Sequence, residues 1–93
     1  MEQNNKVLGI LGGLGPMATA YFYELVTAHT LAKRDQDHID MVISSKATTP
    51  DRTAFILGRS QDDPFVVMEA EAKRLVTFGA QVIAIPGNTA HYF

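Results

Sequence analysis

Three short apolar runs divide the 93-residue chain, and a polar or glycine-rich segment follows each of them. The runs occupy residues 7–11, 39–44 and 82–85. Runs of this length that are apolar at nearly every position are typical of strands buried on both faces. We therefore predict three strands of a parallel sheet.

Between these runs lie two longer stretches for which the sequence predicts α-helices. Residues 18–32 carry apolar side chains at helical spacing. The buried stripe predicted for this helix consists of Ala18, Tyr21, Phe22, Leu25, Ala28 and Ala32. A second helix is predicted over residues 64–78, because Asp63 is a good N-cap and Gly79 a good stop. Its predicted buried stripe consists of Phe65, Met68, Ala72 and Leu75.

The order β-α-β-α-β predicts a three-layer α/β/α fold with a parallel sheet in the order 2-1-3, because right-handed crossovers then place one helix on each face. A short helical turn is expected at residues 54–57, and a third helix from Thr89 onward. A chain of 93 residues forms one domain at most. Since the sequence stops within the first turn of the third helix, we expect residues 1–93 to be a single lobe, the N-terminal half of a longer protein.

The composition excludes several classes of protein. A hydrophobic content of 46% is too high for a disordered tail, and a net charge of −2 offers no basic surface for nucleic acid or an anionic membrane. No apolar run approaches the ~18 residues of a membrane span, and the N-terminus is too polar for a signal peptide, so we expect a cytoplasmic protein. The sequence contains no cysteine, which excludes disulfides and thiolate metal sites.

Unusual polar segments follow all three predicted strands, at residues 12–16, 45–52 and 86–89. Because the carboxyl ends of parallel strands lie at one edge of a sheet, these segments are expected to meet there and form a ligand site. Arg52 could hold a carboxylate through two hydrogen bonds, or it could be a solvated surface arginine. Asn88 and Thr89 could bind a second anionic group or simply cap a helix. No cluster of His, Asp and Glu suggests a metal site.

The glycine-rich segment also fits the G-x-G-x-x-A form of the dinucleotide fingerprint, from Gly13 to Ala18. That fingerprint expects an acidic residue at the end of the second strand, where this chain has Ser44, Ser45 and Lys46. Pro16 also removes an N–H that a pyrophosphate could use. A small dinucleotide-binding half-domain is therefore a minor alternative.

Together the motifs resemble the aspartate/glutamate racemase family over the whole chain. They read GILGGLGPMAT at residues 9–19, PDRT at 50–53 and PGNTAH at 86–91. The resemblance implies racemisation of an acidic amino acid with no cofactor, neither pyridoxal phosphate nor a metal. It also implies two similar α/β lobes with the substrate between them. One cysteine from each lobe would face the α-carbon, one removing the proton and the other returning a proton from the opposite side.

By this resemblance, Arg52 binds the side-chain carboxylate of the substrate, and Asn88 and Thr89 bind its α-carboxylate and amino end. The loop expected to line the site consists of Gly12, Gly13, Leu14 and Gly15. The family pattern at residues 86–89 resembles Pro-Cys-Asn-Thr, so Gly87 stands where the first catalytic cysteine would be. The second cysteine would belong to another lobe, and a second lobe or a second copy of the chain is therefore the expected partner.

Two functions are compatible with this resemblance. The first is the N-terminal lobe of a racemase for aspartate or glutamate that is inactive because it lacks the first catalytic cysteine. The second is a non-catalytic module that binds a carboxylate or a protein partner. Both keep the carboxylate site, and only the first requires a second lobe with its own cysteine.

Overall fold

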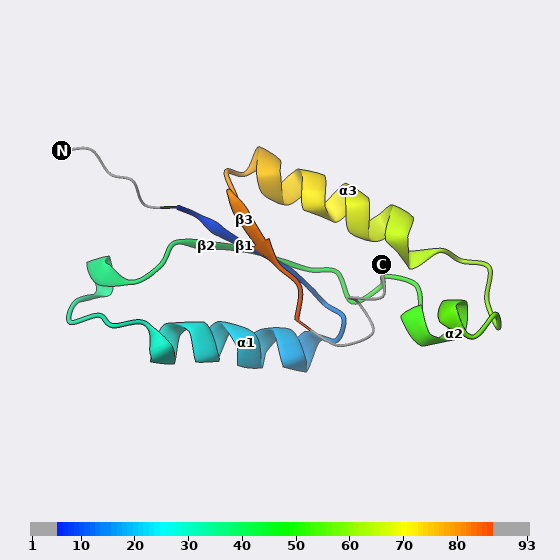
Figure 1. The fold of residues 1–93 in the computed structure, drawn as a ribbon, viewed down its shortest axis with the longest axis horizontal. Helices are drawn as coiled ribbons and strands as arrows, with labels where there is room; N and C mark the ends of the chain where they lie inside the picture. Colours follow the sequence, from blue (N-terminus) through cyan, green and yellow to red (C-terminus); the bar gives the residue numbers. More distant parts are fainter. Residues whose placement is uncertain (1–5, 87–93) are drawn as a thin grey trace.

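A computed structural model describes residues 6–86 of the chain, and its three strands form one parallel sheet in the order β2-β1-β3. The elements are β1 (Leu8–Gly12), α1 (Pro16–His29), the 3-10 helix η1 (Asp35–Asp37), β2 (Met41–Ser45), α2 (Arg52–Ile56), α3 (Pro64–Thr77) and β3 (Val82–Ala84). Figure 1 shows α1 and α3 on opposite sides of the sheet. The predicted α/β fold and strand order are thus confirmed.

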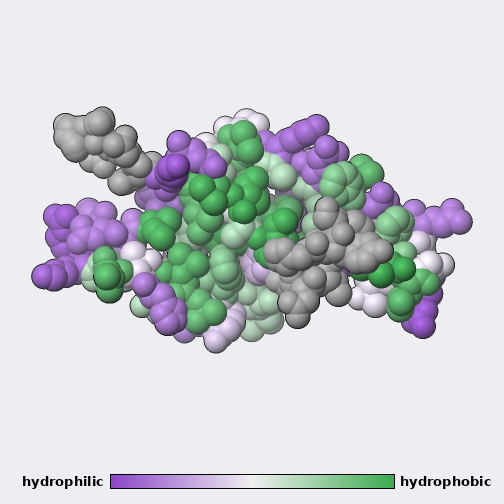
Figure 2. Space-filling view, viewed as in Figure 1, coloured by the Kyte–Doolittle hydropathy of each residue, from purple (hydrophilic) through white to green (hydrophobic). Residues whose placement is uncertain are grey.

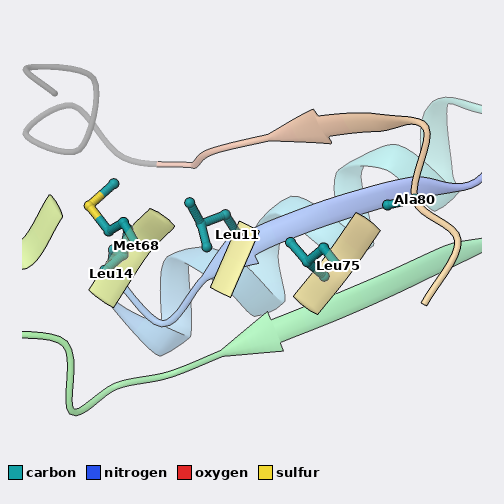
Figure 3. Packing of buried hydrophobic residues seen from close by; sticks show 5 residues of the cluster. All are labelled: Leu11, Leu14, Met68, Leu75 and Ala80. Atoms are coloured by element: carbon teal, nitrogen blue, oxygen red, sulfur yellow. The ribbon is translucent and has the colours of Figure 1, made fainter. Parts of the chain in front are cut away.

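The main apolar cluster lies between α3 and the sheet (Figure 3). Its members are Leu11, Leu14, Met68, Leu75 and Ala80. Val42 of β2 and Ile83 of β3 pack against it. Close approach is possible because β1 has a glycine at position 9, where a Cβ would lie 2.8 Å from the Cβ of Ala80. Full burial of one such leucine or methionine contributes ~1.5–3 kcal/mol, so this layer dominates the core.

The other face of the sheet contacts α1 through a polar residue. Ile10 of β1 is fully buried there, and the one buried residue of α1 is Thr19. A Cβ on Gly12 would overlap the Thr19 side chain, so the helix approaches the sheet at this point. The half-buried apolar residues of α1 are Phe22, Leu25 and Val26.

The predicted buried stripe of α1 is therefore wrong in part. Phe22 and Leu25 are half-buried, whereas the exposed positions are Ala18, Tyr21 and Ala28. Apolarity alone predicts that Tyr21 is more buried than Thr19. The close contact between Thr19 and Gly12 instead places the Thr19 side of the helix against the sheet.

The first helix also ends earlier than predicted, at His29, which leaves Ala32 outside it. Thr30 has an extended backbone, and its hydroxyl donates a hydrogen bond of 2.6 Å to the carbonyl of Val26. This bond satisfies a carbonyl of the last turn, so the helix stops there.

The second long helix begins as predicted, since the Asp63 carboxylate accepts the N–H of Phe65 at 2.9 Å. It ends at Thr77, and Gly79 has a φ of 109°. Phe65 is exposed, contrary to prediction, because it lies off the stripe that Met68 and Leu75 form against the sheet. No helix within residues 6–86 is both long and apolar enough for a membrane span.

Several smaller boundaries also differ from prediction, each by one or two residues. β2 begins at residue 41 instead of 39, and β3 ends at residue 84 instead of 85. The short helix α2 begins at Arg52, two residues before the predicted start. The helix predicted from Thr89 lies outside the described residues.

Candidate functional site

Two of the three segments predicted to form a site meet at the carboxyl edge of the sheet. Gly12 pairs with Ser45 in the parallel ladder, so β1 and β2 end at the same level. Beyond them the backbones touch: Gly13 has a φ of +86°, and a Cβ there would overlap the backbone of Lys46. Only glycine suits both this conformation and this contact. Pro86 of the third segment is half-buried, and Gly87, Asn88 and Thr89 lie outside the described residues.

The glycine-rich loop, residues 12–15, is held from two sides. Leu14 is buried in the cluster under α3. On the other side, the hydroxyl of Thr19 accepts a hydrogen bond of 2.8 Å from the N–H of Gly13 and donates one of 3.0 Å to the carbonyl of Gly15. The N–H of Gly13 is thus already bonded within the protein.

The four residues predicted to line the site therefore differ in accessibility. Gly12, Gly13 and Leu14 are buried, whereas Gly15 is half-buried. Among residues 6–86, nothing lies within 4 Å of a Cβ built on Gly15, so no described atom fills the space beside it. If the loop lines a ligand site, Gly15 is its most accessible member.

Arg52 is positioned by local hydrogen bonds in the second segment. The hydroxyl of Thr49, a buried residue, donates to the carbonyl of Lys46 at 2.7 Å. The carboxylate of Asp51 then accepts the N–H of Ala54 at 3.1 Å and caps α2. Arg52 is consequently the first residue of a helix that lies beyond the carboxyl ends of the strands (Figure 1).

The guanidinium of Arg52 has an unused donor. The residue is half-buried, and in the part of the chain that the structure describes its Nε is buried without a hydrogen-bond partner. Buried polar atoms nearly always have a partner, so an unpaired one needs an explanation. A bound carboxylate would supply two acceptor oxygens in the geometry that a guanidinium prefers.

A buried glutamate beside this edge was missed by the sequence analysis. The carboxylate of Glu71, on α3, accepts a hydrogen bond of 2.8 Å from the hydroxyl of Ser44 and lies 3.5 Å from the guanidinium of Arg74. These contacts tie α3 to the end of β2. The signal was available, because Glu71 lies three residues after Met68 and four before Leu75, on the buried stripe of the helix.

A hollow of about 380 Å³ opens along this flank of the molecule. Its lining consists of Val42, Ile43, Ser44, Ser45, Lys46, Glu71, Arg74, Leu75 and Phe78. It reaches the carboxyl edge at Ser45 and Lys46. The carboxylate of Glu71 faces Ser44 and Arg74, so its role here is to join two elements of the fold.

A larger hollow, of about 650 Å³, lies at the opposite edge of the sheet and is lined by residues 34 and 36–40 together with Lys6. Its main feature is an exposed ion pair of 2.8 Å between Arg34 and Asp37. The hydrogen bond from the Arg34 guanidinium, followed by one from the N–H of Lys33, lowers the pKa of Asp37 from its usual value. Both residues are solvated, and the hollow is remote from the glycine-rich loop and Arg52.

Comparison with known proteins assigns the family. Residues 11–93 match the family model described as Asp/Glu/hydantoin racemase. The chain belongs to this racemase family. A solved structure described as Picrophilus torridus aspartate racemase matches with a TM-score of 0.86 and 36% sequence identity, over 94% of this chain. The match takes up 37% of that racemase chain, so the present chain spans little more than a third of its length.

Membership in the racemase family is consistent with the position of the candidate site. Within residues 6–86, no group of three or more His, Asp or Glu side chains could hold a metal ion. Within the described residues, the guanidinium of Arg52, with its unpaired Nε, is the hydrogen-bond donor that the second segment brings to the carboxyl edge. Such an edge is suited to binding an anion.

Proposed function

We propose that this chain is the N-terminal lobe of a racemase-type protein, that it binds an acidic amino acid at the carboxyl edge of its sheet, and that it does not racemise this ligand alone. The observation that carries the proposal is the buried Nε of Arg52, which has no partner within the described residues. Family membership supplies the ligand class, since the matched model is described as an Asp/Glu/hydantoin racemase.

Aspartate is the first ligand to test, because the solved relative is described as an aspartate racemase. The proposed pose places the side-chain carboxylate of the ligand on Arg52, with Gly15 bordering it. Asn88 and Thr89, which lie outside the described residues, would receive the α-carboxylate and amino end. Glutamate is one methylene longer and is the matched comparison.

The proposed absence of catalysis rests on the sequence. Racemisation without a cofactor needs a base on one side of the α-carbon and an acid on the other, and each positioned group typically contributes ~10²–10⁴-fold. The chain has no cysteine, and Gly87 stands where the family resemblance places the first one. Glycine offers neither a base nor an acid. In this proposal the second thiol belongs to another lobe that completes the site.

Calorimetric titration of the purified chain with aspartate and with glutamate tests the binding. Arg52→Ala should weaken the affinity roughly 10- to 150-fold, the range expected for a hydrogen bond to a charged group. Arg59→Ala is the matched control, because Arg59 is exposed and only its backbone N–H bonds to α2, at 2.7 Å from the Ala54 carbonyl. Equal affinities in wild type and Arg52→Ala would refute the role of Arg52. A parallel titration with NADPH tests the dinucleotide alternative.

Proton NMR in heavy water tests the chemistry. With the 93-residue chain we expect the α-proton signals of aspartate and glutamate to persist at the level of a protein-free control. Gly87→Cys alone should leave them unchanged, because the opposing thiol is still missing. Exchange by the wild-type chain would show that a group other than cysteine acts as the base.

A further inference from the structure

Thr19 lies at the centre of the glycine-rich loop although it belongs to the helix that follows. The residue is 4% exposed, and its hydroxyl accepts from the N–H of Gly13 at 2.8 Å while donating to the carbonyl of Gly15 at 3.0 Å. Its methyl group occupies the space where a Cβ on Gly12 would lie. Three of the four loop residues therefore contact one side chain.

We propose that Thr19 is a positioning residue, which holds the glycine-rich loop in the conformation that admits an acidic amino acid. The inference rests on the proposed function for its ligand. Thr19 itself is buried behind the loop and acts through Gly13 and Gly15, so it does not touch the ligand.

A hydroxyl is needed because it serves as acceptor and donor at once. If it were absent, the buried N–H of Gly13 would lose its partner, and an unpaired buried donor is costly. The carbonyl of Gly15 would keep a second bond, since the N–H of Thr19 also donates to it at 3.1 Å. Loss of the hydroxyl would therefore leave the Gly13 N–H without its partner, whereas the Gly15 carbonyl would remain bonded.

Movement at Gly13 would reach the second site segment. Its backbone lies against the backbone of Lys46, whose carbonyl accepts bonds from the Thr49 N–H at 3.1 Å and the Thr49 hydroxyl at 2.7 Å. That turn leads directly into the Asp51 cap and Arg52. The loop and the arginine are thus linked by one backbone contact, between Gly13 and Lys46, and by the chain that leads from Lys46 to Arg52.

Three variants isolate the hydroxyl. Thr19→Val keeps the shape and removes both hydrogen bonds, whereas Thr19→Ser keeps the hydroxyl. Thr30→Val is the control, because Thr30 lies at the other end of α1 and its hydroxyl makes a similar bond, 2.6 Å to the carbonyl of Val26. We expect Thr19→Val to raise the Kd for aspartate about tenfold, and Thr19→Ser and Thr30→Val to stay within about threefold of wild type.

Amide hydrogen exchange supplies a readout independent of the ligand. In Thr19→Val the Gly13 amide should exchange faster than in wild type, while amides of α3 keep their protection. Thr30→Val should leave the Gly13 amide unchanged. If the Thr19 and Thr30 hydroxyls contributed only to stability, both valine variants would have a lower melting temperature. Their Kd for aspartate would then equal that of wild type at a temperature where the protein is folded.

The outcomes separate the two proposals. If wild type binds neither aspartate nor glutamate, the proposed function fails and the ligand part of this inference fails with it. If wild type binds and Thr19→Val binds equally well, only the positioning role is overturned. Should Thr19→Val fail to fold, the wild-type protein decides: aspartate must shift the amide signals of Gly13 and Lys46, and unshifted signals contradict the proposal.

Discussion

The two long helices of this protein have the same length but bury different kinds of side chain. α1 and α3 each contain 14 residues and begin with a proline. The buried residues of α3 are Pro64, Met68, Glu71 and Leu75, whereas α1 buries Thr19 alone. The α3 face is an apolar core, and the α1 face is organised around the hydrogen bonds of the glycine-rich loop.

The strands beneath the helices show the same difference. Leu11, Val42 and Ile83 lie in or against the cluster under α3. On the α1 side Ile10 is fully buried, but the neighbouring Ile43 and Val82 are 42% and 49% exposed. In Figure 2 hydrophobic residues reach the surface between α3 and α1. We expect the α3 face to supply most of the stability, whereas the α1 face holds the glycine-rich loop through Thr19.

The largest difference between the two faces is expected in the free energy of unfolding when one leucine on each face is replaced by alanine. Leu75→Ala removes a side chain that is 2% exposed and should lower the free energy of unfolding by ~2–5 kcal/mol. Leu25→Ala, on the half-buried side of α1, should cost about 1 kcal/mol. Urea denaturation followed by circular dichroism measures both. Equal costs would show that the two faces contribute alike.

A polar contact on the α3 face should have the next largest effect. Ser44→Ala removes the donor that bonds to the Glu71 carboxylate at 2.8 Å, which should cost ~1–3 kcal/mol because Glu71 is buried. Ser45→Ala changes the adjacent, exposed residue and serves as the control. If the two variants denature at the same urea concentration, the Ser44–Glu71 bond contributes no net stability.

Neighbouring residues of β2 allow a finer comparison. Val42 packs against the α3 cluster, whereas Ile43, which pairs with Ile10 on the α1 side, is 42% exposed. Ile43→Thr should change the free energy of unfolding by no more than about 0.5 kcal/mol, and Val42→Thr should cost about 1 kcal/mol or more, because it places a hydroxyl in the cluster. A larger loss for Ile43→Thr would indicate that α1 covers this position in solution.

The smallest effect is expected at Asp37, outside both cores. Its pKa is lowered in the folded protein, chiefly by Arg34, so its stabilising contribution is present above the unfolded pKa and is lost as the pH falls through the folded pKa. Wild type should therefore be slightly more stable than Asp37→Asn near pH 7, and the difference should shrink as the pH falls. Thermal melts at pH 7 and pH 3 test this. A difference that grows toward acid pH would contradict it.

Much of the fold could be predicted because short-range pattern and connection rules determine it. Near-continuous apolar runs indicated parallel strands, and right-handed crossovers with one helix on each face of the sheet indicated the order 2-1-3 that the structure confirms. The Asp63 cap and the stop at Gly79 could also be predicted, since both depend on local backbone geometry. At the site, the strand pattern placed the segments beginning at Gly12 and Ser45 at one edge.

Tertiary contacts decided which side chains face inward and which donors stay free. The close packing of Gly13 on Lys46 joins residues that are far apart in the sequence, so no local pattern reveals it. Folding also brings the Thr19 hydroxyl to the Gly13 N–H and leaves Gly15 at the surface. The burial of Glu71 likewise depends on the Ser44 hydroxyl, 27 residues away. The sequence by itself determined the elements and their order, because backbone preferences act locally. The tertiary structure decided the partner of Glu71 and the contact of Gly13 with Lys46, because these residues meet only when the chain has folded.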